Sequence, residues 1–217
     1  MQVSFGPFPP TCQYQGFLHE AERLNLLEWA LSNESRFKPA KITGGVFDPE
    51  KRLALKLGDL GPHREVFIRR VAERLPDIFR VIGVKPFPVD FHEIELAAHG
   101  DGAFFATHTD LPIGPVRGAA GGDGRGTHDR HVSAVYYFYR EPRRFTGGEL
   151  RLYRFGDLSG EAGCLTVEPN QNTLVAFPSW ARHEVRRVDC SSRTFADYRF
   201  AVNIWLCRTR SSSQPAS

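Results

Sequence analysis

The run Arg199-Phe-Ala-Val-Asn-Ile-Trp205 decides the fold, because polar and apolar side chains alternate along it. In a β-strand, every second side chain points to the same face of the sheet. One face would carry Phe200, Val202, Ile204 and Leu206, and the other Arg199, Ala201, Asn203 and Trp205. We expect the apolar face to pack beneath helices and the other face, with Arg199 and Asn203, to border a pocket.

The rest of the chain divides into a helical half and a β-rich half at about Gly83. Short β-rich runs follow it, at Val89 to Leu96, His131 to Tyr139, Gly148 to Tyr153 and Thr173 to Phe177. Apolar residues recur at helical spacing before it, from Glu20 to Leu31 and from about Pro62 to Phe79. Pro62 suits a first helical turn, and Pro76 would end or kink the second helix. Helices first and strands after predict a mainly β (α+β) chain whose strands form a sandwich.

Length and composition favour one folded domain. A chain of 217 residues fits a single hydrophobic core, and 41% hydrophobic with 24% charged residues excludes a disordered or membrane-embedded chain. The first ten residues contain no Lys, no Arg and no long apolar run, so we expect neither a secretory signal nor a membrane span, and a cytoplasmic location. Four scattered cysteines without a C-x-x-C pair indicate ordinary thiols.

Charge and loop composition add weaker information. The net charge of +3 is mildly basic, and the densest arginine groups are read as a solvated rim, so no strong nucleic-acid signature is present. A glycine-rich stretch over residues 112–130 predicts a long loop, either a functional lid or disordered. Residues 209–217 are read as a flexible polar tail.

A candidate metal site begins at Ala106-Thr-His108-Thr-Asp110, where an imidazole and a carboxylate two residues apart share one face of a strand. Two nitrogen ligands and one carboxylate suit Fe(II) and leave three positions open. The third ligand would come from a distant strand, and His183 is the candidate, 75 residues after His108. Taken alone, His183 is better read as a surface histidine at the start of a strand, and the motifs around it reverse that interpretation.

Six ordered segments resemble the catalytic domain of prolyl-4-hydroxylase-type 2-oxoglutarate oxygenases. They are Phe104-Phe-Ala-Thr-His108-Thr-Asp110, Val132-Ser-Ala-Val-Tyr-Tyr137-Phe, Gly147-Gly-Glu-Leu150, Leu174-Val-Ala-Phe-Pro178, His183-Glu-Val185 and Arg199-Phe-Ala-Val-Asn-Ile-Trp205. The resemblance implies a double-stranded β-helix, a distorted jelly roll, with supporting N-terminal helices. It predicts one domain over residues 1–208, with helical support over about 15–83 and a jelly-roll core over about 84–208. It also implies that His108, Asp110 and His183 hold Fe(II).

The resemblance further implies 2-oxoglutarate as a cosubstrate, whose far carboxylate a planar guanidinium would hold. We choose Arg199, which stands six residues before Trp205 as in the family motif; Arg193 is a rival, because the family arginine often follows the distal histidine by about ten residues. Tyr137 falls where the family uses a strand tyrosine for the same carboxylate. His99 falls where relatives often carry a pocket tyrosine. The alternative for Tyr137 is a core aromatic residue, and the alternative for His99 is an ordinary loop histidine.

The implied activity is that of an Fe(II)- and 2-oxoglutarate-dependent dioxygenase that consumes O2 and hydroxylates an unactivated C–H bond, with ascorbate as a further candidate cofactor. The expected substrate is a prolyl residue in a peptide or protein, or an amino-acid-like small molecule; the oligomeric state is not predicted. One alternative is an alkylated nucleic-acid demethylase, because such enzymes also show two arginines separated as Arg193 and Arg199 are. Another is a non-catalytic jelly-roll or cupin-like metal-binding protein.

Overall fold

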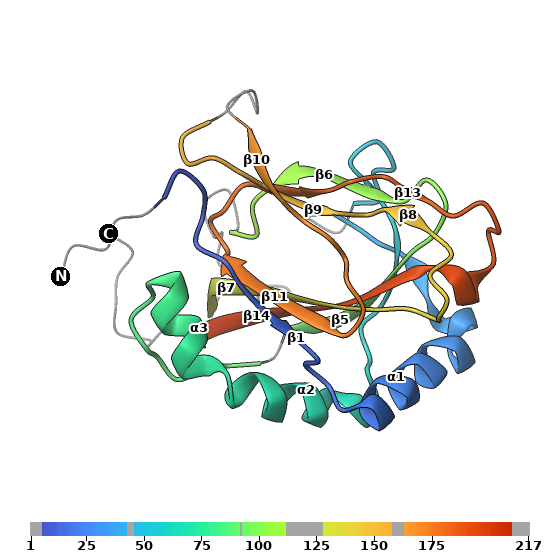
Figure 1. Cartoon of the computed structure of the whole chain (residues 1–217), viewed down its shortest axis with the longest axis horizontal. Coiled ribbons are helices and arrows are strands. Elements are labelled where there is room, and N and C mark those ends of the chain that lie inside the picture. Colours follow the sequence, from blue (N-terminus) through green and yellow to red (C-terminus); the bar gives the residue numbers. More distant parts are fainter. Residues whose placement is uncertain (1–5, 43–45, 92, 112–127, 158–162, 210–217) are drawn as a thin grey trace.

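The computed structural model describes residues 6–42, 46–91, 93–111, 128–157 and 163–209. Within these residues, two antiparallel β-sheets face each other, and the helices cover the outer face of the larger sheet (Figure 1). The predicted glycine-rich loop and polar tail lie outside the described residues, except that residues 128–130 and Thr209 belong to strands.

The larger sheet has seven strands. In spatial order they are β1 (Cys12–Gln15), β11 (Thr173–Pro178), β7 (His128–Phe138), β14 (Arg199–Thr209), β5 (Ile94–His99), β4 (Leu55–Leu57) and β2 (Lys38–Pro39). The smaller sheet has β10 (Cys164–Val167), β9 (Leu150–Tyr153), β12 (His183–Val185), β6 (Phe104–His108) and β3 (Arg52–Leu53), and β13 (Val188–Asp189) pairs with β8 (Thr146–Gly147). This arrangement is the double-stranded β-helix that the family resemblance implies.

Three α-helices pack against the larger sheet: α1 (Glu20–Ser32), α2 (His63–Ala72) and α3 (Leu75–Ile82). Two 3-10 turns, η1 (Glu34–Arg36) and η2 (Phe195–Asp197), complete the described helical structure. Phe67 of α2 and Ile78 of α3 lie in the same buried core as Phe200 and Val202 of β14. The apolar face predicted for the run from residue 199 to residue 205 therefore does pack beneath the helices.

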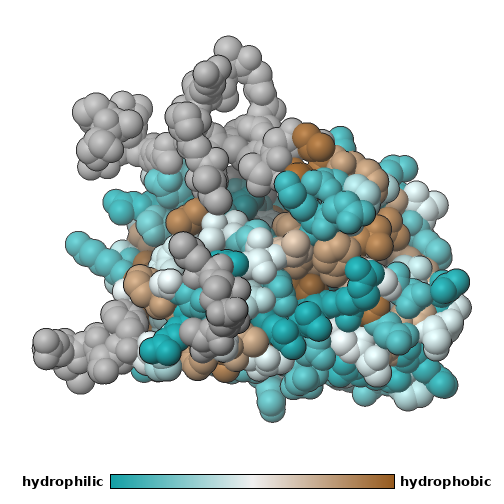
Figure 2. Space-filling model, turned by 90° about the horizontal axis from the view of Figure 1, so that it is seen from above, coloured by the Kyte–Doolittle hydropathy of each residue, from teal (hydrophilic) through white to brown (hydrophobic). Residues whose placement is uncertain are grey.

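The two faces of the molecule differ in their cover. Helices shield the larger sheet, whereas no described helix covers the smaller one, and the surface seen from above mixes hydrophilic with hydrophobic residues (Figure 2). Among the described residues, no helix is long and apolar enough to cross a membrane.

The helical half differs from its prediction in two ways. The single helix expected from Pro62 to Phe79 is two helices, α2 and α3, which are separated at Glu73 and Arg74. Pro76 does not end a helix; it lies in the first turn of α3, where its missing N–H removes no helical hydrogen bond. The region predicted as helical support also contains β2, β3 and β4, strands of two or three residues that are too short to show an alternating pattern.

Candidate metal centre

The pairing of β6 with β12 places His108 directly beside His183, and their ring centroids lie 4.2 Å apart. The register then shifts, because Val185 pairs with Phe105, so β6 carries one more residue than β12 between the paired positions. Such a β-bulge redirects side chains. It turns Phe105 and His108 toward the same pocket, where their rings stack with centroids 3.6 Å apart.

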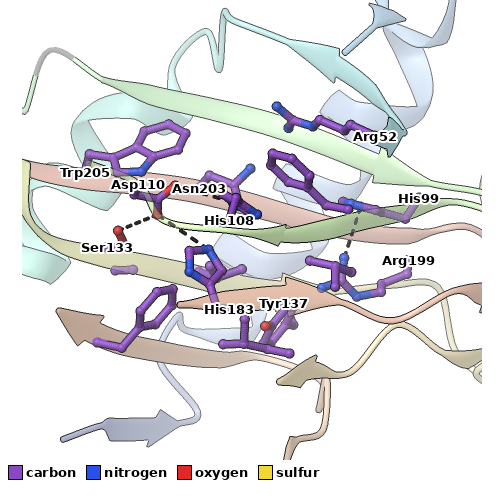
Figure 3. A pocket seen from close by; sticks show the side chains of 16 residues that line it. Arg52, His99, His108, Asp110, Ser133, Tyr137, His183, Arg199, Asn203 and Trp205 are labelled. Atoms are coloured by element: carbon purple, nitrogen blue, oxygen red, sulfur yellow. Dashed lines mark hydrogen bonds and ion pairs between the residues drawn. The ribbon is translucent and has the colours of Figure 1, made fainter. Parts of the chain in front are cut away.

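Asp110 completes the group from just beyond the end of β6. Its Oδ1 lies 3.6 Å from His108 Nε2, and its Oδ2 lies 3.7 Å from His183 Nε2. The possible ligand atoms of the three residues all lie within 4.8 Å of one another. The structure therefore brings together the three residues that the sequence nominated, at one end of a pocket between the two sheets (Figure 3).

Hydrogen bonds orient both imidazoles for metal binding. The Nδ1 of His108 lies 2.9 Å from the carbonyl oxygen of Ala106, and the Nδ1 of His183 lies 2.9 Å from that of Ala181. Because Nδ1–H donates to a carbonyl, the lone pair of each ring is on Nε2, which faces the centre of the group.

The electrostatics of the group agree with this orientation. Burial and nearby His108 lower the pKa of His183 to about 4, so its ring is neutral at pH 7. Burial alone would raise the pKa of Asp110, but His183, His108 and a hydrogen bond from Ser133 lower it below its ordinary value. Two imidazole nitrogens and one charged carboxylate on one face are the donor set that suits Fe(II).

The other end of the pocket gathers Arg199, Tyr137 and His99 on the inner face of the larger sheet. Arg199 pairs with His99 across β14 and β5, and Ala201 pairs with Tyr137 across β14 and β7. The guanidinium carbon of Arg199 lies 4.7 Å from the centroid of the Tyr137 ring, and Nη1 lies 3.0 Å from His99 Nδ1. Arg199 is only 1% exposed.

This end of the pocket has the chemistry of a carboxylate site. Burial and the charge of Arg199 hold the pKa of His99 well below its usual range, so His99 accepts from Arg199 at Nδ1 and carries its proton on Nε2. Burial raises the pKa of Tyr137, so its hydroxyl keeps its proton. Arg199 Nε is buried without a hydrogen-bond partner, and no described carboxylate lies within ion-pair distance of this guanidinium. Three donors and a buried positive charge without a direct ion pair suit a carboxylate.

Arg193, the rival to Arg199, lies elsewhere. Its side chain is 78% exposed, and its Nε donates to Asp101 Oδ2 at 3.0 Å. Among the described residues, Arg199 lines the pocket and Arg193 does not. Asn203 and Trp205 border the same pocket, as the alternation along β14 predicted.

Two polar pocket residues were missed by the sequence analysis. Ser133 stands four residues before Tyr137 on β7, so strand alternation alone could have placed it on the same face. Arg52 enters from β3, lies 4.6 Å above the ring of Phe105 and pairs with Glu95 at 3.2 Å. A two-residue strand gives no sequence signal that could have found Arg52.

Comparisons with known proteins agree with this geometry. The family model described as the 2OG-Fe(II) oxygenase superfamily matches residues 94–207. An uncharacterized PKHD-type hydroxylase of Synechocystis sp. (strain ATCC 27184 / PCC 6803 / Kazusa) is 38% identical over 198 residues, which are 89% of this chain. The chain spans 62% of the length of that curated relative.

Solved structures share the fold. A Pseudomonas putida prolyl-4-hydroxylase superposes with a TM-score of 0.62 at 21% identity, covering 92% of this chain and 94% of that one. A prolyl hydroxylase from Trichoplax adhaerens, in complex with a hypoxia inducible factor oxygen degradation domain peptide fragment, gives a TM-score of 0.66 at 18% identity, covering 91% and 83%. At these identities the likeness concerns the fold alone.

Proposed function

The chain belongs to the 2OG-Fe(II) oxygenase superfamily, and we propose that it is an Fe(II)- and 2-oxoglutarate-dependent dioxygenase that hydroxylates an unactivated C–H bond. Membership of this family implies Fe(II), 2-oxoglutarate and O2. One observation carries the proposal: the same pocket contains the His108, Asp110 and His183 group at one end and the buried, incompletely bonded Arg199 at the other.

His108, Asp110 and His183 would hold Fe(II) and leave three further positions for other ligands. When bound, the iron supplies the redox chemistry that couples conversion of 2-oxoglutarate and O2 to succinate and CO2 with insertion of one oxygen atom into the substrate C–H bond. The chain itself supplies orientation. The backbone carbonyls of Ala106 and Ala181 fix both imidazole rings with Nε2 available as the ligand atom.

Arg199, Tyr137 and His99 would bind the far carboxylate of 2-oxoglutarate. The guanidinium supplies the charge, and the Tyr137 hydroxyl and the His99 Nε2–H supply donors. In the family pattern, a small hydroxyl residue often stands two residues after the arginine, where this chain has Ala201. Tyr137 and His99 would supply the hydrogen bond that Ala201 cannot donate. Because the three side chains are almost fully buried, their interactions with a carboxylate would be weakly screened by water.

We propose that the substrate is a prolyl residue in a peptide or protein, or an amino-acid-like small molecule. The support is the similarity to a PKHD-type hydroxylase and a pocket wall that is largely apolar. The apolar wall is formed by Phe105, Val135, Leu150, Phe177 and Val185. The cytoplasmic location, the use of ascorbate and the single domain over residues 1–208 stay predictions.

A succinate-release screen tests the activity and the substrate together. Purified protein with Fe(II), 2-oxoglutarate and O2 is offered free amino acids, proline-containing peptides and a cell extract, with and without ascorbate. We expect substrate-dependent succinate and a product heavier by one oxygen atom, both lost in His183→Ala. Succinate release that persists in His183→Ala would contradict the assignment of the metal site.

Titration of 2-oxoglutarate into the Mn(II)-loaded protein separates an oxygenase from a non-catalytic metal-binding jelly roll. We expect binding in the parent protein and much weaker binding in Arg199→Met. Failure of the parent to bind would favour the non-catalytic protein. Methylated single-stranded DNA belongs in the same screen, although the two-arginine pattern that suggested a demethylase does not converge on the pocket, because Arg193 lies at the surface.

A further inference from the structure

Asp110 lies on a bend beyond the end of β6, so strand pairing does not fix its carboxylate. Its backbone N–H donates to the carbonyl of Ser179 at 3.0 Å, and Arg130 Nη1 donates to its carbonyl oxygen at 3.2 Å. Both contacts hold the backbone and leave the side-chain torsions free to rotate between their preferred positions. A separate contact must therefore orient the carboxylate.

Ser133 makes that contact from the middle of β7. It is 2% exposed, and its Oγ donates to Asp110 Oδ2 at 2.5 Å (Figure 3). Its other neighbour is the buried Ser179, whose Oγ lies 3.0 Å away. Because a hydroxyl has one proton, donation to the carboxylate leaves Ser133 Oγ as the acceptor for the Ser179 hydroxyl. Two buried hydroxyl groups therefore form a chain that ends on Asp110.

We propose that Ser133 is a positioning residue that holds Asp110 as a metal ligand through one oxygen only. Ser133 engages Oδ2, which also lies 3.7 Å from His183 Nε2, whereas Oδ1 lies 3.6 Å from His108 Nε2 and receives no hydrogen bond from Ser133. Hydrogen bonds from a hydroxyl to a carboxylate are among the stronger ones in proteins, so this bond resists rotation of the carboxylate. A carboxylate that ligated through both oxygens would occupy a position that the open three-ligand set must leave free. The inference rests on the proposed function, because it needs a metal at this site.

Titration of the metal-free protein with Co(II) and with Mn(II) tests the role of Ser133 without any turnover. Ser133→Ala should weaken binding of both ions by roughly 10- to 100-fold, the usual effect of removing a group that orients a ligand. The visible absorption of the Co(II) protein should also change, because the carboxylate is free to ligate through both oxygens. Ser133→Thr keeps a hydroxyl and should restore the parent spectrum and affinity, which separates the hydrogen bond from mere filling of space.

Each outcome decides the proposal. Parent-like Co(II) affinity and spectrum in a folded Ser133→Ala would overturn it. If Ser133→Ala does not fold, Ser133→Cys replaces it: a thiol is a weak donor, and Mn(II) prefers oxygen ligands, so weakened Mn(II) binding supports the proposal and unchanged binding overturns it. Absence of binding of either ion in the parent protein would instead count against the proposed function, so the two failures are distinguishable.

Discussion

Replacement of Arg199 by methionine should stabilise the ligand-free protein and at the same time strongly weaken binding of 2-oxoglutarate. The guanidinium is buried, it stacks on Tyr137 and donates to His99, and its Nε has no partner. A buried charge without a direct ion pair opposes folding. Methionine is a flexible apolar side chain that can fill much of the same space. Function and stability are therefore expected to conflict at this residue.

The size of both effects follows from the contacts. An unsatisfied buried donor costs about 1–3 kcal/mol, and loss of the donor to His99 Nδ1 offsets about 1 kcal/mol of the gain. The net stabilisation is then on the order of 1 kcal/mol, or about 2–4 °C in Tm for a protein of this size. Loss of a buried, charge-assisted pair weakens binding by about 2–5 kcal/mol, so the Kd for 2-oxoglutarate should rise at least about 30-fold.

Thermal unfolding followed by fluorescence, with and without Mn(II) and 2-oxoglutarate, measures both quantities in one experiment. The matched control is Arg193→Met, which removes an exposed ion pair with Asp101 and should change neither quantity, because such pairs contribute about 0–1 kcal/mol. A Tm of ligand-free Arg199→Met several degrees below the parent would refute the reasoning about a buried charge without a direct ion pair. An unchanged affinity for 2-oxoglutarate would place the carboxylate site elsewhere.

Three further predictions follow from the same pocket. Gly148 has a φ of +75°, and an added Cβ would lie 2.6 Å from Arg199 Cδ. Gly148→Ala should therefore weaken 2-oxoglutarate binding by roughly 10- to 100-fold, measured by calorimetry, while Mn(II) binding stays unchanged. Equal losses of affinity for 2-oxoglutarate and for Mn(II) would contradict this prediction. His108→Ala should remove the visible charge-transfer band expected from anaerobic Fe(II) plus 2-oxoglutarate, and a preserved band would exclude His108 as a ligand. The pKa values of His183 (about 4) and His99 are depressed in the folded protein, so the unfolded chain binds more protons than the folded one as pH falls from about 6.5 toward 4. The free energy of unfolding of the metal-free protein should therefore fall by up to about 1.4 kcal/mol per pH unit for each histidine. Urea unfolding at pH 5 and pH 7 measures this, and His99→Gln should reduce the dependence of stability on pH.

The parts of the fold that sequence reasoning predicted well are its longest strands. β7 and β14 each have 11 residues, and their alternation or apolar run is long enough to show in the sequence. Strands β2 and β3 have two residues each, and they exist because they pair with β4 and β6. Their formation depends on distant partners, so no local pattern could have predicted them.

In the candidate site, too, some features follow from the local sequence and others depend on strand pairing. The spacing in the sequence nominated His108 and Asp110, which the structure brings together, but strict alternation would have placed His108 on the face opposite to Phe105. The bulge opposite Glu184 turns both side chains toward the pocket, and it becomes visible only when β6 pairs with β12. The choice between the two arginines also depended on pairing, because Arg199 lies opposite His99 on β5, whereas Arg193 precedes the strand with a φ of 52°.

Strand β7 connects the two ends of the pocket. It carries Ser133 at the metal end and Tyr137 at the other, four residues apart, so about 13 Å of extended backbone separates them. β7 is paired on both sides, with β11 and with β14, along both of these positions. A change in the distance between the ends would therefore require breaking two ladders of backbone hydrogen bonds within the core. The separation of Ser133, which contacts Asp110, from Tyr137 is thus a property of the larger sheet, and it is set before any cosubstrate binds.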